Sequence, residues 1–470
     1  MRERTGVNAT AARSPRLTGR ARELTLEIAA EARAEWGFAT DIIARTFRAH
    51  RELPSGDRRR ISEAVYGLIR WDRRLDAILD EAVTTGGGGG ARTVTAAELA
   101  PMVRDRLKLI IHELREGLPL EAAEAEVQAA LGAPPRDPTG RALIDLSRAH
   151  EPDAGLGKRT GLDREAVRLS YPTWMLEQFA NDLGGEAALA AADAMNRRAP
   201  MTIRVNTVRL SREACIARLG EENIVARPTV LAPAGLVLET RVNAFGLTAF
   251  RDGLFEVMDE GSQLVAELVA PPPGGRVLDA CAGAGGKTLA LGAIMGGKGR
   301  LVALDVDGRK LEELRRRARR AGLNNVEARA VTDGSVGDAA PGTFHRVLID
   351  APCSGLGTLR RNPEARWRVT PQTLTKAGFP ARQLGLLVTY APLCAVGGRL
   401  IYATCTLLEA ENDRVVDRFL TDRDDFVRVP VKEIWGREPA ERVGDGMNLR
   451  ISPNVADTDG FFAAVLRRVR

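Results

Sequence analysis

The feature that most constrains the fold is a glycine-rich turn within RVLDACAGAGGKT, residues 276–288. A short apolar run ends at Asp279, glycines follow at Gly283, Gly285 and Gly286, and an apolar helical pattern comes next. Glycine allows positive φ angles and lets the backbone approach a ligand that a β-carbon would hold off. This order of strand, glycine turn and helix predicts an α/β domain with a nucleotide-type ligand site.

Two common phosphate-binding patterns do not fit this turn. The phosphate loop GxxxxGK[ST] requires glycine five residues before Gly286, where the sequence has Cys281, and this disfavours a nucleoside triphosphatase. The dinucleotide pattern GxGxxG starts at Gly283 but meets Thr288 at its third glycine. The turn fits the looser loop of methyltransferases that bind S-adenosylmethionine, where no phosphate has to be held.

Strand and helix patterns alternate from the glycine turn to the end of the chain, as in a doubly wound parallel sheet. Strand-like runs cover residues 301–307, 326–333, 345–353 and 397–405, and a last one starts at Gly460. The carboxyl ends of the strands form the ligand crevice of such sheets. We expect these strand-closing residues to converge there: Asp279, Asp305, Asp333, Asp350 and Cys405.

The rest of the chain predicts two further parts. Residues 20–150 show apolar positions at helical spacing and predict an all-α bundle, interrupted by a glycine run at 86–90. Residues 132–165 are rich in Pro, Gly and Asp and predict a linker, whereas residues 166–270 mix strand and helix patterns in a small α/β module. The third domain spans residues 271–470.

Composition limits the class of protein. The net charge of +6 favours a polyanionic partner as much as a solvated surface. The N-terminus does not resemble a secretory signal, and no apolar run approaches the roughly 20 residues of a membrane helix. Scattered cysteines without CxxC spacing and four isolated histidines predict a reducing cytoplasm and no metal. The cysteines are Cys215, Cys281, Cys353, Cys394 and Cys405.

Two of these cysteines follow predicted strands on the ligand side of the sheet: Cys353 in DAPCSG and Cys405 in YATCT. A lone cysteine is usually a small buried hydrophobic residue. Two at adjacent strand ends favour catalysis, because a thiolate is a strong nucleophile.

Such thiols suit methylation of cytosine at carbon 5. That carbon is a poor nucleophile, but a thiolate added to carbon 6 makes it enamine-like and able to accept a methyl group from a sulfonium. A proton must then leave carbon 5 so that the thiol can be expelled. An acidic group near N3 would stabilise the charge that develops on the base.

Two aspartates suit the remaining parts of a nucleoside ligand. Asp305 lies twenty residues after Gly285 at the end of a strand, where a carboxylate can bind both ribose hydroxyls. Asp333, which closes the next strand, could accept a hydrogen bond from the adenine amino group.

In order and spacing these segments resemble the motifs of the Sun or RsmB-like family of RNA 5-methylcytosine methyltransferases. The motifs are RVLDACAGAGGKT, DAPCSGLGTLRRNPEARWR, YATCTLLEAEND and DTDGFFAAVLRR, preceded by the similar segments MTIRVNT and MDEGSQLVAELV. The resemblance runs from about Ser170 to the C-terminus. SEAVYGLIRW and RLDAIL in the N-terminal bundle resemble the NusB-like RNA-binding domain of the rRNA-modifying branch.

The resemblance implies a role for each site residue. Cys405 is the nucleophile, Cys353 assists product release, and Asp350 or Lys287 touches the base. The cofactor, S-adenosylmethionine, is bound by Cys281, Ala282, Gly283, Ala284, Gly285, Gly286, Lys287, Asp305, Asp333 and Asp350. The family usually has CAAPGGKT here, so CAGAGGKT leaves the turn looser without removing a donor or acceptor side chain.

RNA contacts are expected from an arginine cluster with one aromatic residue, because arginine pairs with phosphates and an aromatic ring stacks on an unpaired base. The cluster is Arg360, Arg361, Arg366, Trp367 and Arg368. For Trp367, packing in the core is an equal alternative.

The sequence therefore predicts a cytoplasmic, monomeric, S-adenosylmethionine-dependent RNA cytosine-5 methyltransferase that acts on 16S rRNA. One alternative is the same chemistry on tRNA. Another is a non-catalytic RNA-binding factor of ribosome assembly or antitermination, which would not need Cys353, Cys405, Lys287 and Asp350 together.

Overall fold

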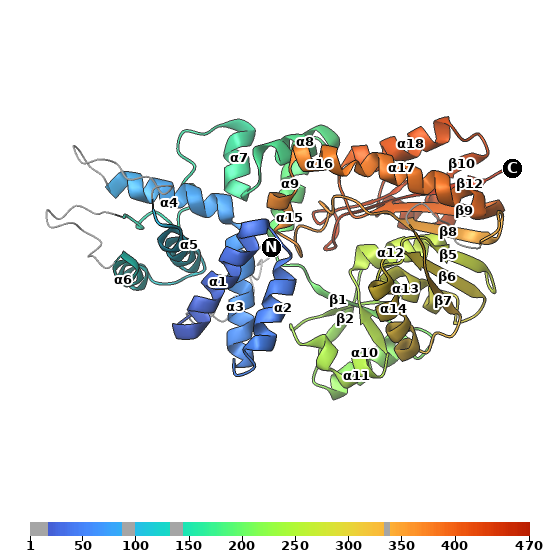
Figure 1. Ribbon diagram of the computed structural model, residues 1–470, viewed down its shortest axis with the longest axis horizontal. Helices are drawn as coiled ribbons and strands as arrows, with labels where there is room; N and C mark the ends of the chain where they lie inside the picture. The colour runs from blue at the N-terminus through green and yellow to red at the C-terminus, as the bar shows by residue number, and fades with distance from the viewer. Residues whose placement is uncertain (1–16, 87–98, 132–143, 333–338) are drawn as a thin grey trace, which may run out of the picture. The chain divides into compact units, whose positions relative to one another are not determined.

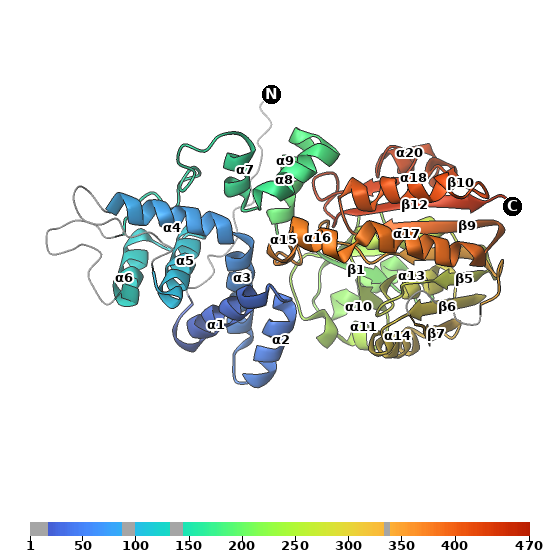
Figure 2. The same ribbon diagram turned by 45° about the horizontal axis from the view of Figure 1, so that its top comes forward.

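The computed structural model describes residues 17–86, 99–131, 144–332 and 339–470, and the chain forms two compact units (Figures 1 and 2). The first unit extends to Glu177 and includes Asn362–Arg368. The second consists of Gln178–Arg361 and Val369–Arg470. The short segment 362–368 thus packs with residues that lie far from it in the sequence.

The first unit is helical, as predicted. Its helices are α1 (Gly19–Glu35), α2 (Ala39–Ala49), α3 (Ser55–Arg70), α4 (Asp72–Gly86), α5 (Pro101–Arg115), α6 (Leu120–Leu131), α7 (Gly161–Leu169) and α15 (Ala365–Arg368), and α8 (Thr173–Leu183) continues into the second unit. Apolar residues at helical spacing, such as Leu24 and Ile28 in α1 or Ile61 and Val65 in α3, meet in one buried core. Gly86 ends α4, and residues 87–90 of the predicted glycine run and 132–143 of the predicted linker lie outside the described residues.

The second unit begins with a small module around a four-stranded antiparallel sheet in the order β2-β3-β1-β4. Its elements are α9 (Gly185–Asn196), β1 (Met201–Val205), α10 (Arg212–Glu221), β2 (Ala226–Pro228), β3 (Gly235–Leu238), a 3-10 turn (Ala244–Gly246), α11 (Thr248–Arg251) and β4 (Phe255–Val257). Ile203, Leu219, Leu236 and Phe255 form its own buried core. This is the small α/β module that the sequence predicts.

The large sheet has the order β10-β12-β9-β8-β5-β6-β7, with β11 beside β12. Its strands are β5 (Arg276–Asp279), β6 (Arg300–Asp305), β7 (Val326–Ala330), β8 (Phe344–Asp350), β9 (Cys394–Thr404), β10 (Phe426–Val429), β11 (Leu449–Ile451) and β12 (Phe461–Arg468). Strands β9, β8, β5, β6 and β7 run parallel. Strand β12 is antiparallel to β9, β10 and β11. Its pairing with β11 follows a short connection without a helix, which only an antiparallel pair allows.

Helices cover both faces of this sheet, as the predicted doubly wound fold requires (Figures 1 and 2). The helices are α12 (Glu260–Val269), α13 (Gly286–Ile294), α14 (Gly308–Ala321), α16 (Pro371–Ala377), α17 (Phe379–Tyr390), α18 (Asp413–Thr421), α19 (Lys432–Trp435) and α20 (Arg437–Glu441), with 3-10 turns at Ala391–Leu393 and Glu409–Glu411. Alternate strand residues face opposite cores: Val277 packs with α12 and α13, whereas Leu278 packs with α17 and α18. Among the described residues, no helix is both long and apolar enough to cross a membrane.

Candidate active site

Two thiols meet at the carboxyl ends of the parallel neighbours β8 and β9. The sulfur atoms of Cys353 and Cys405 lie 3.3 Å apart, and the backbone N–H of Cys405 donates to the Cys353 sulfur at 3.4 Å. Both residues are half-buried. Strand pairing therefore joins two cysteines that are 52 positions apart in the sequence.

A buried set of side-chain hydrogen bonds holds the Cys405 loop. Thr404 Oγ1 donates to Asn412 Oδ1 at 2.5 Å, and Asn412 Nδ2 donates to the carbonyl of Thr406 at 3.1 Å. The carbonyl of Cys405 itself accepts from the N–H of Gly357 at 2.9 Å. Because both sides of the loop are fixed, the Cys405 thiol has a defined position.

The two thiols differ in their environment. The hydrogen bond to Cys405, followed by burial, raises the pKa of Cys353 well above its ordinary value. Cys353 therefore stays protonated at neutral pH and can donate its S–H to the sulfur of Cys405.

Lys287, in the first turn of α13, forms an ion pair with Asp350 at the end of β8. The distance between Nζ and Asp350 Oδ2 is 2.7 Å, and Nζ lies 5.2 Å from the centre of the Phe461 ring. Burial alone would lower the pKa of Lys287, but the nearby charges of Asp350, Cys405 and Asp279 outweigh it and raise the pKa. The ammonium group therefore stays charged within electrostatic range of the Cys405 sulfur.

Asp279, the last residue of β5, is buried beneath this pair. Its Oδ2 accepts from Thr288 Oγ1 at 2.7 Å, and its Oδ1 has no hydrogen-bond partner in the part of the chain that the structure describes. Burial raises its pKa to about 7. Asp279 was predicted to lie at the crevice but not to take part in the site, although an acid shortly before a glycine turn is visible in the sequence.

The glycine turn follows Asp279, and two of its residues have positive φ angles: +54° at Gly283 and +91° at Gly285. A β-carbon on Gly285 would lie 2.6 Å from Cγ of Leu314, whereas no described atom lies within 4 Å of a β-carbon built on Gly283. The N–H of Gly283 donates to Asp305 Oδ2 at 2.8 Å. The turn is thus packed tightly on its α14 side and open at Gly283.

These residues fit S-adenosylmethionine. Space is open at Gly283 and Gly286, the N-terminus of α13 begins there, and the half-buried Asp305 carboxylate stands at the end of the next strand. Cys281 and Ala284 are half-buried beside this space, whereas Ala282 is buried and packs into a small core with α14. Asp333 lies outside the described residues, so its predicted place in the site stays a prediction.

Comparison with known proteins identifies this arrangement. A family model described as 16S rRNA methyltransferase RsmB/F matches residues 266–467, and one for the ferredoxin-like domain of RsmF/B-like methyltransferases matches residues 171–244. The probable ribosomal RNA small subunit methyltransferase B of a Synechocystis species is 32% identical over an alignment of 443 residues that covers 91% of this chain and 95% of that protein. The chain belongs to the RsmB/Sun family of methyltransferases.

Other RsmB/Sun relatives agree. The ribosomal RNA small subunit methyltransferase B of Pseudomonas putida is 31% identical over 77% of this chain and 81% of its own. A solved methyltransferase homologue from Pyrococcus horikoshii is 28% identical, with a TM-score of 0.56 over 65% of this chain and 98% of that chain. The solved protein PH0851, 24% identical with a TM-score of 0.74 over 96% of this chain and 100% of that one, shares the fold. The resemblance drawn from the sequence motifs is confirmed.

The arginine cluster of this RsmB/Sun member is placed differently from its prediction. Arg360 is buried and donates to Asp457 Oδ1 at 2.6 Å and to the carbonyl of Arg198 at 2.9 Å. Arg361 pairs with Asp259 at 2.8 Å and Asp459 at 2.7 Å. The predicted phosphate contact is wrong for Arg360, because its guanidinium is enclosed, and two carboxylates already neutralise Arg361.

Arg366 and Trp367 belong to the core of the helical unit. Arg366 is 0% exposed, lies 4.1 Å from the centre of the Tyr171 ring and donates to the carbonyls of Arg70 and Ser170 at 3.2 and 3.1 Å. Trp367 Nε1 donates to the carbonyl of Ile69 at 2.7 Å. The predicted RNA contact is therefore wrong for Arg366, and core packing, the alternative for Trp367, is what the structure shows. Arg368 is half-buried, with its guanidinium 4.4 Å from the Phe38 ring centre.

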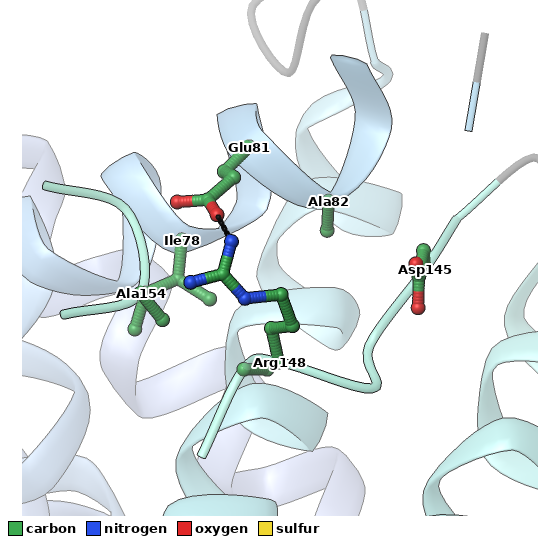
Figure 3. A pocket seen from close by; sticks show the side chains of 7 residues that line it. Ile78, Glu81, Ala82, Asp145, Arg148 and Ala154 are labelled. Carbon is green, nitrogen blue, oxygen red and sulfur yellow. Dashed lines mark hydrogen bonds and ion pairs between the residues drawn. The ribbon is translucent and has the colours of Figure 1, made fainter. Parts of the chain in front are cut away.

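Two features outside the crevice concern metal binding and cavities in the part of the chain that the structure describes. Within residues 17–86, 99–131, 144–332 and 339–470, no group of three or more His, Cys, Asp or Glu side chains could hold a metal ion. A hollow in the helical unit has Arg148 pointing to Glu81, with Nη1 and Oε1 3.4 Å apart (Figure 3). It is lined by Ile78, Glu81, Ala82, Asp145, Arg148, Ala149 and Ala154. Glu81 and Arg148 pair with each other there, and Asp145 accepts from the backbone N–H of Ser147.

Proposed function

We propose that this protein transfers the methyl group of S-adenosylmethionine to carbon 5 of a cytosine in 16S ribosomal RNA, through a covalent bond between Cys405 and the base. Membership of the RsmB/Sun family supports the reaction, and the names of the relatives, ribosomal RNA small subunit methyltransferase B, support the substrate. The observation that carries the proposal is the pair of thiols 3.3 Å apart beside the Lys287–Asp350 ion pair.

Cys405 acts as the nucleophile on carbon 6. Its sulfur lies 3.3 Å from the sulfur of Cys353 and within electrostatic range of the Lys287 ammonium, so a hydrogen-bond partner and a positive charge stand beside the attacking atom. The fixed loop around Thr404 and Asn412 holds the sulfur at the strand end, so little reorganisation is needed when the base arrives.

Asp350 is the group that meets the base, and Lys287 orients it. The side chain of Asp350 is 29% exposed, whereas that of Lys287 is 10% exposed. Lys287 occupies Oδ2 of the carboxylate, which leaves Oδ1 to face the ring near N3. Addition of the Cys405 thiolate to carbon 6 drives negative charge into the ring, and a proton shared between N3 and the Asp350 carboxyl group compensates that charge.

Cys353 assists release of the product. After water takes the proton from carbon 5, the released electron pair re-forms the double bond between carbons 5 and 6, and the bond from carbon 6 to the Cys405 sulfur breaks with the sulfur leaving as an anion. The protonated Cys353, in contact with it, stabilises the departing thiolate or protonates it. Without this thiol, the covalent adduct should persist.

The turn from Cys281 to Lys287, with Asp305, would hold the methyl donor. S-adenosylmethionine supplies an electrophilic methyl group on a sulfonium. The N–H groups at the start of α13 and the open backbone at Gly283 can receive its methionine part, and the Asp305 carboxylate can receive the ribose hydroxyls. Asp305 already orders the turn by accepting from Gly283, so one side chain serves the turn and the ligand.

The remaining expectations complete the proposal. We assign residues 20–150 to a NusB-like RNA-binding domain, 166–270 to a substrate module and 271–470 to the methyltransferase domain. Of the five predicted RNA contacts we keep Arg368, which is half-buried. The protein is proposed to act in the cytoplasm as a monomer without a metal ion.

Replacing the thiols one at a time tests the mechanism. Cys405→Ala should abolish methyl transfer and leave RNA binding intact, because it removes the nucleophile and little volume. Cys353→Ala should accumulate a protein–RNA adduct that survives a denaturing gel. Cys394→Ala is the matched control, since Cys394 begins the same strand but is buried away from the crevice. Full turnover by Cys405→Ala, or no adduct with Cys353→Ala, would contradict these roles.

Bisulfite sequencing identifies the RNA. Comparison of cells with and without the gene should show one 16S rRNA cytosine that loses its methyl group and regains it with the wild-type gene but not with Cys405→Ala. Loss of methylation in tRNA instead would support the tRNA alternative and refute the proposed substrate.

A further inference from the structure

Helix α14 lies between the glycine turn and the small module. Leu314 and Arg317 are three residues apart and share one face of the helix. Leu314 packs under Gly285, and Arg317 Nη1 donates to the carbonyl of Ala284 at 2.7 Å. The turn therefore rests on α14 through one apolar contact and one charged hydrogen bond.

The other side of Arg317 is held by Glu256 on β4 of the module. Arg317 Nη2 and Nε lie 3.0 and 3.3 Å from Glu256 Oε2, and Arg320 pairs with Oε1 of the same carboxylate. Glu256 is 4% exposed, so its two ion pairs are shielded from water. Each oxygen of this carboxylate is thus assigned to one arginine.

The module also anchors the C-terminal end of α14. Asn206 Nδ2 donates to the carbonyl of Ala321 at 2.8 Å, and Arg209 Nη2 donates to the carbonyl of Arg320 at 3.1 Å. The helix end cannot move without breaking these bonds. Arg317 is consequently fixed through its own backbone as well as through its side chain.

We propose that Glu256 and Arg317 are positioning residues for S-adenosylmethionine: the small module holds Arg317, and Arg317 holds the turn in its ligand-ready conformation. Ala284 lies between two glycines with positive φ angles and lacks the fixed φ angle that proline would provide. The chain there has many accessible conformations, and a charged hydrogen bond to the Ala284 carbonyl selects one of them. This inference rests on the proposed function only in taking the turn as the methyl-donor site.

The test compares two arginines that pair with the same carboxylate, of which Arg317 contacts the turn carbonyl in the structure and Arg320 does not. Equilibrium binding of S-adenosylmethionine to the full chain is measured by calorimetry without RNA, for Arg317→Met and Arg320→Met. Loss of a charge-assisted hydrogen bond predicts about tenfold weaker binding for Arg317→Met. Arg320→Met should change Kd by less than about twofold, because Ala284 keeps its partner. Both variants should lower the melting temperature, since each removes one ion pair of Glu256; Arg317→Met also loses the bond to Ala284, and Arg320→Met loses the contact with the Phe250 ring.

Arg317→Lys gives the conservative comparison. A single amine cannot bond both the Ala284 carbonyl and Glu256 as the guanidinium does. The Kd of Arg317→Lys for S-adenosylmethionine should therefore lie between the values of the wild type and of Arg317→Met. If Arg317→Met does not fold, the Kd values of Arg317→Lys and Arg320→Lys for S-adenosylmethionine are compared instead. Equal Kd values within either pair would overturn the proposal.

The outcome can be separated from failure of the proposed function. Binding of the donor needs neither Cys405 nor the correct RNA, so Cys405→Ala should bind it like the wild type. A wild-type protein that binds S-adenosylmethionine but methylates no cytosine would refute the reaction and leave this role of Arg317 standing. A wild-type protein that does not bind it would refute both.

Discussion

Replacing Gly285 with alanine should destabilise the methyltransferase domain. Gly285 has φ +91° and ψ 16° at the start of α13, where an L-residue costs about 1–2 kcal/mol. The new methyl group would also lie 2.6 Å from Cγ of Leu314, and overpacking of this kind typically costs about 1–3 kcal/mol. The free energy of unfolding should therefore fall by about 2–5 kcal/mol in total.

Gly286→Ala is the matched control in the same turn. Gly286 begins α13 without a positive φ, and no described atom lies within 4 Å of a β-carbon built there. Its free energy of unfolding should stay within about 1 kcal/mol of the wild type. The methyl group would, however, enter the space assigned to S-adenosylmethionine, so donor binding should weaken without a loss of stability.

Thermal unfolding and donor titration of both variants separate the two effects. For a domain of this size, the loss expected for Gly285→Ala corresponds to a melting temperature lower by about 10 °C. Two results would refute the reasoning: a Gly285→Ala variant that melts with the wild type, or a Gly286→Ala variant that is destabilised as much as Gly285→Ala.

Two further predictions concern buried charged groups. Burial raises the pKa of Asp279 from 3.8 to about 7. Between these pH values the folded chain holds a proton that the unfolded chain lacks. The stability that this proton provides is lost as pH rises from about 4 to about 7. Asp279→Asn is the control, because its side chain still accepts from Thr288 but does not titrate. In denaturation measured at several pH values, the free energy of unfolding of the wild type relative to this variant should fall by up to about 4 kcal/mol over this range. A difference that does not change with pH would contradict the burial argument. Arg366→Met should destabilise the helical unit by about 1–3 kcal/mol in thermal unfolding, because two buried carbonyls lose their donor, and should leave RNA affinity unchanged. Arg368→Met should instead weaken RNA binding and leave the stability of the helical unit unchanged. If only Arg366→Met reduced RNA affinity, the RNA contact predicted for Arg366 from the sequence would be supported.

Much of the site could be predicted because its residues follow strands directly. Asp279, Asp305, Asp350 and Cys405 each close or follow a strand whose apolar pattern is visible in the sequence. In a parallel sheet such positions meet at one edge, so the local patterns predict that these residues lie near one another, although they predict no distances. The antiparallel direction of strand β12 could not be predicted, because the pattern of apolar residues does not show which way a strand runs in its sheet.

The arginine cluster shows where this reasoning fails. Arg360, Arg361 and Arg366 look like solvated cations in the sequence, and in the structure their donors go to carbonyls and carboxylates of the protein. Nothing in the composition of residues 360–368 separates a cation that awaits phosphate from one that closes a core. The partners of Arg366, at Arg70 and Ser170, are about 200 or more positions away in the chain.

The sequence by itself determined the strand, turn and helix of the glycine loop, the division of the chain into helical and α/β parts, and the presence of two cysteines at strand ends. These depend on residues that are neighbours along the chain, where periodicity and backbone preference act. Only the tertiary structure decided which charges pair: Lys287 with Asp350, Arg317 with both Glu256 and Ala284, and Arg366 with the helical core. The physical reason is that a buried charge must find a partner, and that partner is supplied by packing between distant segments.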